Sequence, residues 1–372
     1  MLIKFTVKNY AGFKDEIIFD LSSKRKINFQ KELVHKGVVQ KALVYGQNGS
    51  GKSSLCKAIM DITYHLVDKE KENVPDHLYF NVGTNTLIAE FNYYFKFESK
   101  IVRYSYAKYA PTLLAYEKLY VDGNIIFEYN YMDSSHNVNK IEEAQSLNLK
   151  GITPQMSALK YLYNNTILNE KSIITKLVKY VEGMLFFRSL TDGNMYIGYS
   201  KGAESLSSII IRNGKTEEFK KFLQNEGLNY DIVEYEDANG ARNLGIQFEN
   251  GKRVPFSSII SSGTKTMWLF YCWMLEFQHL SLLIMDEFDA YYHYSTAQSI
   301  LKIVNQFSNM QVIITTHNIA LMNNDVTRPD TCFILTDNKT ITPLIAMTKT
   351  EIRKKSNLSK MYLDGKFTNI LV

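Results

Sequence analysis

The sequence predicts an α/β protein in which a mixed sheet carries a glycine-rich loop, with an antiparallel β subdomain and a compact inserted α+β lobe. Three observations predict this class. An apolar run at 42–45 precedes a glycine-rich loop and then a segment with helical periodicity. Two later runs, 281–285 and 311–315, are mostly apolar and end in polar residues. From 86 to 130, apolar residues recur at every second position, which is the period of a strand.

Length and composition indicate a folded protein of more than one lobe. The chain has 372 residues, which exceeds the size at which one hydrophobic core usually stops growing. Hydrophobic residues make up 45% and charged residues 22%, an ordinary globular balance. The net charge of +5 permits contact with DNA but is too small to predict it. The basic cluster at 24–26 is interpreted as a solvated face rather than a nucleic-acid site.

The cysteines and the N-terminus predict a cytoplasmic protein. Cys56, Cys272 and Cys332 lie far apart inside apolar segments, as expected of buried thiols in a reducing compartment. The N-terminus lacks the pattern of a secretory signal. Since no window approaches 18 uninterrupted apolar residues, we expect no contact with a membrane.

The N-terminal part begins with a predicted β-hairpin. Residues 2–7 and 16–21 alternate apolar and polar side chains, and the hairpin leads toward a strand at 38–45. Apolar residues at three- and four-residue spacing then predict one helix over 53–67. The charged run at 68–76 ends near a proline and is interpreted as an exposed connection.

The middle of the chain is predicted to be an antiparallel meander followed by helices. One face of its first strand carries Leu87, Ala89, Phe91, Tyr93, Phe95 and Phe97. Aromatic residues on strands can stack on bases, but core packing is the favoured interpretation. Residues 131–152 are polar and irregular, a linker or loop. Helical spacing returns at 156–168, 173–185 and 214–226, and two Asn-Gly turns frame a strand at 242–248.

The glycine-rich loop is a candidate phosphate site. Its glycines allow successive backbone N–H groups and the following helix N-terminus to point at one anion. Lys52 adds a positive charge, and the Ser53 hydroxyl is a ligand suited to Mg²⁺. A plain glycine turn ahead of a helix is the less favoured alternative, because a strand and a helix flank the loop. The candidate residues are Gly46, Asn48, Gly49, Ser50, Gly51, Lys52, Ser53 and Ser54.

Three later segments carry polar groups that suit the same chemistry. The strand at 281–285 leads to Asp286, a candidate Mg²⁺ ligand, and Glu287, a candidate base for an attacking water. The strand at 311–315 leads to His317, which suits contact with a γ-phosphate, although a lone histidine here would more often be structural. A second anion site is predicted at a helix N-terminus, formed by Ser261, Ser262, Gly263 and Thr264.

Taken in order, the segments GQNGSGKSS, SSGT, LLIMDE with FDA, and TTHN resemble the ABC-type ATPases of the AAA class that are related to SMC, RecF and OLD proteins. The resemblance covers 1–67 and 254–346. It implies that ATP and Mg²⁺ are the cofactors and that hydrolysis is slow and regulatory. It assigns Lys52 and Ser53 to Walker A, Ser261 to Thr264 to the signature, Asp286 and Glu287 to Walker B, Asp289 to His293 to the D-loop, and His317 to the H-loop.

The resemblance also divides the chain and shows departures from the family pattern. The expected parts are 1–85 and 254–346 for the ATPase core, 86–253 for the inserted lobe and 347–372 for a tail. Ser262 and Thr264 replace the usual glycine and glutamine, as in ATPases of prokaryotic anti-phage systems such as PARIS, Septu and abortive-infection operons. The D-loop lacks its closing aspartate. Gln155 is the candidate for the Q-loop glutamine.

Three functions remain after this comparison. The favoured one is an ATP-dependent switch that dimerises head to head and controls a partner effector, such as a nuclease, in antiviral defence. The second is a RecF- or SMC-like ATPase of DNA repair. An OLD-type nuclease is disfavoured, because the chain leaves little length after the ATPase core for a nuclease domain.

Overall fold

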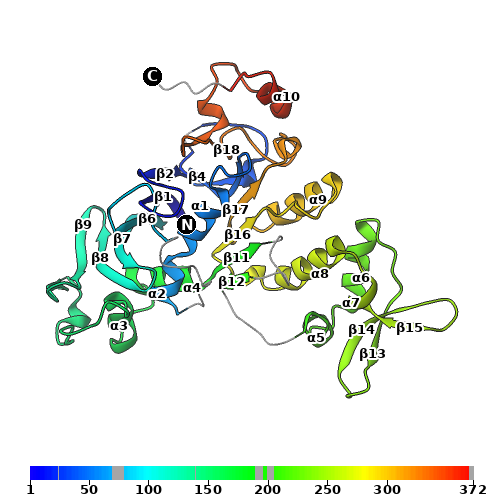
Figure 1. The fold of residues 1–372 in the computed structure, drawn as a ribbon, viewed down its shortest axis with the longest axis horizontal. Coiled ribbons are helices and arrows are strands. Elements are labelled where there is room, and N and C mark those ends of the chain that lie inside the picture. The colour runs from blue at the N-terminus through cyan, green and yellow to red at the C-terminus, as the bar shows by residue number, and fades with distance from the viewer. Residues whose placement is uncertain (24, 69–78, 139, 189–195, 199–204, 368–372) are drawn as a thin grey trace.

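The computed structural model describes residues 1–372 except 24, 69–78, 139, 189–195, 199–204 and 368–372 (Figure 1). The predicted connection at 68–76 lies almost entirely outside the described residues. Two seven-stranded sheets dominate the fold. Within the described residues, no helix combines the length and the apolar character needed to cross a membrane. The predicted α/β class, with a mixed sheet and an antiparallel subdomain, is confirmed.

The central sheet is mainly parallel, in the order β12-β11-β16-β17-β5-β18-β19. The side chains of β5, β16, β17 and β18 are buried throughout, because helices or the second sheet cover both faces. The strands are β5 (Lys41–Tyr45), β11 (Met184–Arg188), β12 (Tyr196–Gly198), β16 (Leu282–Asp286), β17 (Gln311–Thr316), β18 (Cys332–Leu335) and β19 (Ile341–Pro343).

The second sheet is antiparallel, in the order β10-β9-β8-β7-β6-β1-β2. It confirms both the N-terminal hairpin and the meander, and it joins them, because β1 pairs with β6. The predicted apolar face of the meander is the buried one for Ala89, Phe91, Tyr93 and Phe95, whereas Leu87 is exposed. The strands are β1 (Leu2–Lys8), β2 (Ile17–Asp20), β6 (Ala89–Phe97), β7 (Lys100–Ala110), β8 (Leu113–Val121), β9 (Asn124–Asn130) and β10 (His136–Asn137).

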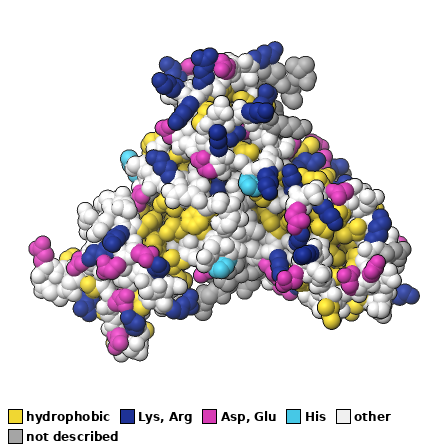
Figure 2. Space-filling model, turned by 180° about the vertical axis from the view of Figure 1, so that it is seen from behind, with side chains coloured by type: hydrophobic (Ala, Val, Ile, Leu, Met, Phe, Trp, Pro, Cys, Tyr) yellow, Lys and Arg dark blue, Asp and Glu magenta, His cyan; other side chains and the backbone are white. Residues whose placement is uncertain are grey.

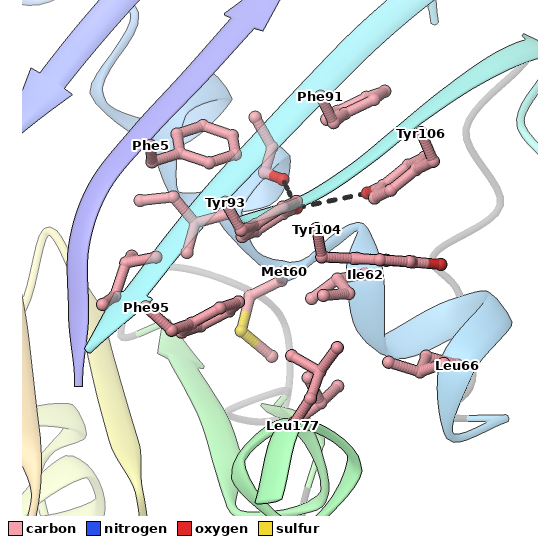
Figure 3. Packing of buried hydrophobic residues seen from close by; sticks show 14 of the residues in the cluster. Phe5, Met60, Ile62, Leu66, Phe91, Tyr93, Phe95, Tyr104, Tyr106 and Leu177 are labelled. Carbon is pink, nitrogen blue, oxygen red and sulfur yellow. Dashed lines mark hydrogen bonds between the residues drawn. The ribbon is translucent and has the colours of Figure 1, made fainter. Parts of the chain in front are cut away.

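The helix that follows the glycine-rich loop packs between the two sheets (Figures 1 and 3). The prediction of one helix over 53–67 is wrong in detail. The chain forms α1 (Lys52–Met60) and α2 (Ile62–Leu66), with tighter hydrogen bonds around Asp61. The Asp61 N–H donates to the Ala58 carbonyl and the Tyr64 N–H donates to the Asp61 carbonyl, in both cases three residues back. Figure 3 shows Met60, Ile62 and Leu66 packed against the aromatic face of the antiparallel sheet.

The helices predicted at 156–168, 173–185 and 214–226 correspond to three shorter helices, at 158–165, 173–182 and 216–225. Leu185 lies in β11 and not in a helix, because the second of these helices ends before Gly183. The other elements are β3 (Val34–His35), β4 (Val38–Val39), α3 (Ala158–Asn165), α4 (Ile173–Glu182), α5 (Leu206–Arg212), α6 (Thr216–Asn225), β13 (Ile232–Glu236), β14 (Arg242–Gln247), β15 (Arg253–Pro255), α7 (Phe256–Ile259), α8 (Ser262–Met274), α9 (Tyr294–Asn305) and α10 (Leu358–Leu363). Short 3₁₀ turns occur at Lys31–Leu33, Glu142–Ala144, Phe277–His279, Ile319–Leu321 and Leu344–Ala346.

The two large sheets continue across the boundaries predicted at residues 86 and 254. β6 pairs with β1, and β11 pairs with β16 of the central sheet. The part that stands apart from both sheets is smaller: α5, α6, the three-stranded sheet β13-β14-β15 and α7 pack at one end of α8 (Figure 1). The predicted domain division itself stays a prediction.

A buried ion pair ties the α1–α2 segment to the antiparallel sheet. The Asp61 carboxylate accepts hydrogen bonds from Lys108 Nζ, from Tyr106 at 2.9 Å and from Tyr79 at 3.0 Å. Asp61 and Lys108 are 0% and 1% exposed. Such a pair is costly to break from one side only, since the remaining charge then stays buried without its partner.

We therefore predict that Lys108→Met lowers the free energy of unfolding by about 3–5 kcal/mol. Chemical denaturation monitored by tryptophan fluorescence measures this change. Asp61→Asn combined with Lys108→Met removes both charges and is expected to cost less than Lys108→Met alone. A single variant as stable as the wild type would show that the pair does not hold the helix to the sheet.

Candidate functional site

The glycine-rich loop connects the end of β5 to the start of α1, as predicted. Gly46 lies so close to its neighbours that a Cβ there would sit 2.9 Å from the Leu335 carbonyl oxygen and 2.5 Å from Ser50 Oγ. Gly49 and Gly51 adopt φ angles of +80° and +111°, which other residues rarely adopt. The three glycines are thus required by the path of the loop.

Lys52 is the first residue of α1 and is 4% exposed. Its Nζ donates to the carbonyl oxygens of Gly46 at 2.8 Å and Gln47 at 3.0 Å. Burial lowers the pKa of Lys52, and the negative charges of Glu287, Asp286 and Asp289 partly oppose this change. The lysine therefore lies within electrostatic range of all three acidic residues.

Several backbone donors of the loop are available to an anion. In the part of the chain that the structure describes, the N–H groups of Gly49, Gly51, Lys52 and Ser53 have no hydrogen-bond acceptor. The last two belong to the first turn of α1, whose N–H groups cannot be satisfied within the helix. Ser53 and Ser54 are half-buried and Asn48 is exposed. These donors, together with Lys52, suit a phosphate group.

Asp286 ends β16 and is fully buried. Its Oδ1 accepts a hydrogen bond from Thr315 Oγ1 at 2.6 Å, and Cys56 Sγ lies 3.9 Å from the same oxygen. Because Cys56 is one helical turn after Lys52, this contact places Asp286 beside the first turns of α1. The carboxylate and the Ser53 hydroxyl thus come from adjacent elements.

Glu287 follows directly in a left-handed backbone conformation, with φ of +48°. This conformation costs roughly 1–2 kcal/mol for a residue other than glycine. The Glu287 N–H donates to Thr315 Oγ1 at 2.9 Å, so one threonine hydroxyl holds both acidic residues. The sequence-based prediction missed Thr315. Its position at the polar end of β17, two residues before His317, was the available signal.

Asp289 and His317 lie at the same edge of the central sheet as Lys52. Asp289 Oδ2 accepts a hydrogen bond from Thr316 Oγ1 at 2.9 Å, and its buried Oδ1 has no partner among the described residues. Burial raises the pKa of Asp289, while the hydrogen bond from Thr316 and the charge of His317 oppose the rise. His317 is exposed at the end of β17. An unsatisfied carboxylate oxygen beside an exposed histidine is consistent with a ligand-binding edge.

The predicted signature lies elsewhere. Ser261 caps α8, its Oγ accepting a hydrogen bond from the Thr264 N–H at 3.1 Å, and Ser262 is exposed. Gly263 packs against the D-loop, where an added Cβ would lie 2.8 Å from the Tyr291 carbonyl oxygen. No hydrogen bond among the described residues joins 261–264 to the loop at 46–52. Figure 1 shows that α8 begins beside α7, away from α1.

Gln155 is not brought to this site. It is exposed in the turn before α3, near the end of the antiparallel sheet where Leu114 donates its N–H to the Pro154 carbonyl. The structure therefore gathers Lys52, Ser53, Asp286, Glu287, Asp289 and His317 at one edge of the central sheet and leaves the signature turn and Gln155 apart.

Comparison with known proteins identifies a matching family model. Residues 41–323 match a family model described as "AAA domain, putative AbiEii toxin, Type IV TA system". No curated protein matches the chain.

Among solved structures, the chain is similar to the SMC head domain from Thermotoga maritima, with 13% identity over 94% of this chain and 99% of that one and a TM-score of 0.43. It is also similar to an Smc head bound to the C-terminal domain of ScpA from Pyrococcus furiosus, with 12% identity over 92% and 95% and a TM-score of 0.41. Because the family model matches well over half of the chain, the chain belongs to the AAA-domain family that carries the AbiEii description.

Proposed function

We propose that the protein is an ATP-binding and ATP-hydrolysing switch. The observation that carries this proposal is the convergence of Lys52, Asp286 and Glu287 at one edge of the sheet, with Thr315 holding both acidic residues. Family membership supports it, since the matched model describes an AAA domain. ATP is the substrate, and Mg²⁺ is the cofactor that the donor set suits.

Each residue has a defined task in this proposal. Lys52 exchanges its bonds to the Gly46 and Gln47 carbonyls for bonds to the phosphates. Ser53 and Asp286 would hold Mg²⁺, which supplies positive charge to the phosphate oxygens when bound. Glu287 accepts a proton from the attacking water, and its left-handed backbone conformation sets the direction of its Cα–Cβ bond. His317 reaches the γ-phosphate from the next strand.

The signature turn requires a second chain. Ser261, Ser262 and the N-terminal turn of α8 form a proposed anion site, which among the described residues has no hydrogen bond to the glycine-rich loop of the same chain. By the resemblance to ABC-type ATPases, two chains meet head to head, and each supplies its signature to the nucleotide on the other. Asp289 and the D-loop, which packs on Gly263, would lie next to that interface.

The switch is proposed to control a separate effector in antiviral defence. The matched family is named for a putative toxin of a toxin–antitoxin system, which supports a role in abortive infection. The residues gathered at the site all serve nucleotide chemistry, so a cutting activity is assigned to a partner such as a nuclease. ATP bound between two chains would favour one conformation of the protein, and ATP hydrolysis would allow the protein to leave that conformation.

The alternative is a RecF- or SMC-like ATPase that acts on DNA. One observation favours it: Lys and Arg side chains gather over the C-terminal part of the molecule (Figure 2). In the C-terminal tail at 347–372, the exposed basic residues among those described are Lys349, Arg353, Lys354, Lys355, Lys360 and Lys366. A basic surface of this kind suits a phosphate backbone. Turnover that rises several-fold with added DNA would favour this alternative.

The first functional prediction separates binding from turnover. Lys52→Ala is expected to abolish ATP binding, because it removes the cation of the loop. Glu287→Gln is expected to keep ATP binding and to slow hydrolysis by roughly 10²-fold or more, because only the base is lost. Equilibrium binding of a fluorescent ATP analogue and single-turnover hydrolysis measure the two effects. Wild-type turnover in Glu287→Gln would exclude Glu287 from the mechanism.

The second prediction concerns the shared site. Glu287→Gln with ATP is expected to form a dimer, or a larger assembly of dimers, in light scattering. Ser262→Glu places a negative charge on the exposed first residue of α8, which a helix N-terminus tolerates, but which repels phosphate. Mixing inactive Lys52→Ala with inactive Ser262→Glu protein should restore one intact site per hybrid dimer. If neither variant regains activity in any mixture, the shared site is wrong.

The third prediction concerns the effector. The purified chain is expected to hydrolyse ATP and to leave DNA and RNA intact in the presence of Mg²⁺ or Mn²⁺. Gel assays of nucleic acid cleavage, run beside a phosphate-release assay on the same fractions, test this. Cleavage that co-purifies with the chain and disappears in Asp286→Ala would contradict the proposal.

A further inference from the structure

A second lysine contacts the glycine-rich loop from outside the segments described so far. Lys339 Nζ donates to the carbonyl oxygens of Ser50 at 2.7 Å and Gly49 at 3.2 Å. Lys339 lies in the turn between β18 and β19. Nothing in the sequence pattern around it indicates a phosphate site, so the contact is visible only in the folded chain.

We infer that Lys339 is a positioning residue that holds the loop in its phosphate-binding conformation. This inference rests on the proposed function, namely that the loop binds ATP. It assigns to Lys339 no contact with the nucleotide and no part in the chemical step.

The position of Lys339 beside the glycine-rich loop is set by strand pairing. β18 pairs in parallel with β5, with Ile334 opposite Tyr45, so the turn after β18 lies beside the loop after β5. The turn is closed by hydrogen bonds from the Thr336 N–H to the Thr340 carbonyl and from the Lys339 N–H to the Thr336 carbonyl, both 3.0 Å long. Lys339 itself has φ of +58°, a left-handed conformation that this turn imposes.

One of the two carbonyls that Lys339 binds belongs to a peptide group that also carries an available donor of the loop. The Ser50 carbonyl shares its peptide group with the Gly51 N–H, one of the donors without an acceptor among the described residues. In a trans peptide the C=O and N–H groups point in opposite directions, so a cation on the carbonyl lies on the far side of the loop from the phosphate. Hydrogen bonds in such a chain strengthen one another, so Lys339 makes the Gly51 N–H a better donor.

A second neighbour supports the loop from behind. A Cβ on Gly51 would lie 3.1 Å from a ring carbon of Phe13 and 3.9 Å from Lys339 Nζ. The ring of Phe13 is fully buried. The loop at Gly51 is therefore confined by an aromatic ring and by a cation, and only the lysine can be removed without opening a cavity in the core.

The experiment compares nucleotide affinities of four purified full-length proteins: wild type, Lys339→Met, Lys339→Arg and Lys150→Met. Lys150 is an exposed lysine in the loop before α3 and serves as the matched control. Calorimetry with ATP and with ADP, both without hydrolysis in an EDTA buffer, gives the dissociation constants. Steady-state hydrolysis with Mg²⁺ then separates KM from kcat.

Lys339→Met is expected to weaken ATP and ADP binding equally, by about tenfold, because the charge-assisted hydrogen bonds from Lys339 to the loop carbonyls are lost. KM should rise with little change in kcat, and Lys339→Arg should restore most of the affinity. Equal affinity in Lys339→Met and wild type would overturn the inference. So would a loss for ATP alone, which would mean that Lys339 contacts the γ-phosphate.

Two further outcomes are decisive. The first concerns stability, measured as the melting temperature without nucleotide. The positioning role is wrong if Lys339→Met melts far below the wild type, while Lys339→Arg melts like the wild type and yet binds both nucleotides as weakly as Lys339→Met. If wild type and Lys150→Met bind neither ATP nor ADP, the proposed function itself fails, and this result is distinct from failure at Lys339 alone.

Discussion

The parallel alignment of β16, β17 and β5 is the constraint on which the site depends. Met285 lies opposite Ile314, and Thr316 lies opposite Tyr45, so these strands end at the same edge of the sheet. Residues that follow parallel strands must therefore meet, although they are far apart in the chain. The glycine-rich loop, the acidic pair and the histidine segment each follow one of the three strands. Their convergence is a consequence of strand pairing rather than of any attraction between them.

The antiparallel sheet fixes the helix that carries Lys52. α1 and α2 have one side on the central sheet and the other on the aromatic face of the meander (Figure 3). The hydroxyl of Tyr93 donates to the Ala58 carbonyl at 2.8 Å, and Lys108 binds Asp61 at the junction of the two helices. Polar contacts of this kind set the position of the helix along its axis, which apolar packing alone leaves less defined. The start of the same helix is where phosphate donors are needed.

The site contains locally unfavourable features, and contacts with the surrounding fold compensate for them. Glu287 has a left-handed backbone, Asp286 is fully buried, and burial raises the pKa of Asp289. Thr315 donates a hydrogen bond to Asp286, and Thr316 donates one to Asp289, so each carboxylate is held by a hydroxyl from β17. Backbone strain and buried charge often occur together at functional sites. The same edge receives Lys52 from the neighbouring strand–loop–helix unit.

By itself, the sequence determined the class of the fold, the loop at 46–54 and the residue types at the ends of the buried strands. Those signals are local: glycine spacing, a period of two or of 3.6, and polar residues after apolar runs. Tertiary structure alone decided the rest. Asp61, where the helix breaks, pairs with Lys108 of a distant strand. The strand at Leu185 depends on pairing with β16, and the roles of Thr315 and Lys339 depend on contacts between segments distant in the chain. These contacts join segments that are distant in the chain, so no local sequence pattern predicts them. The energy of such a contact exists only once both segments are folded.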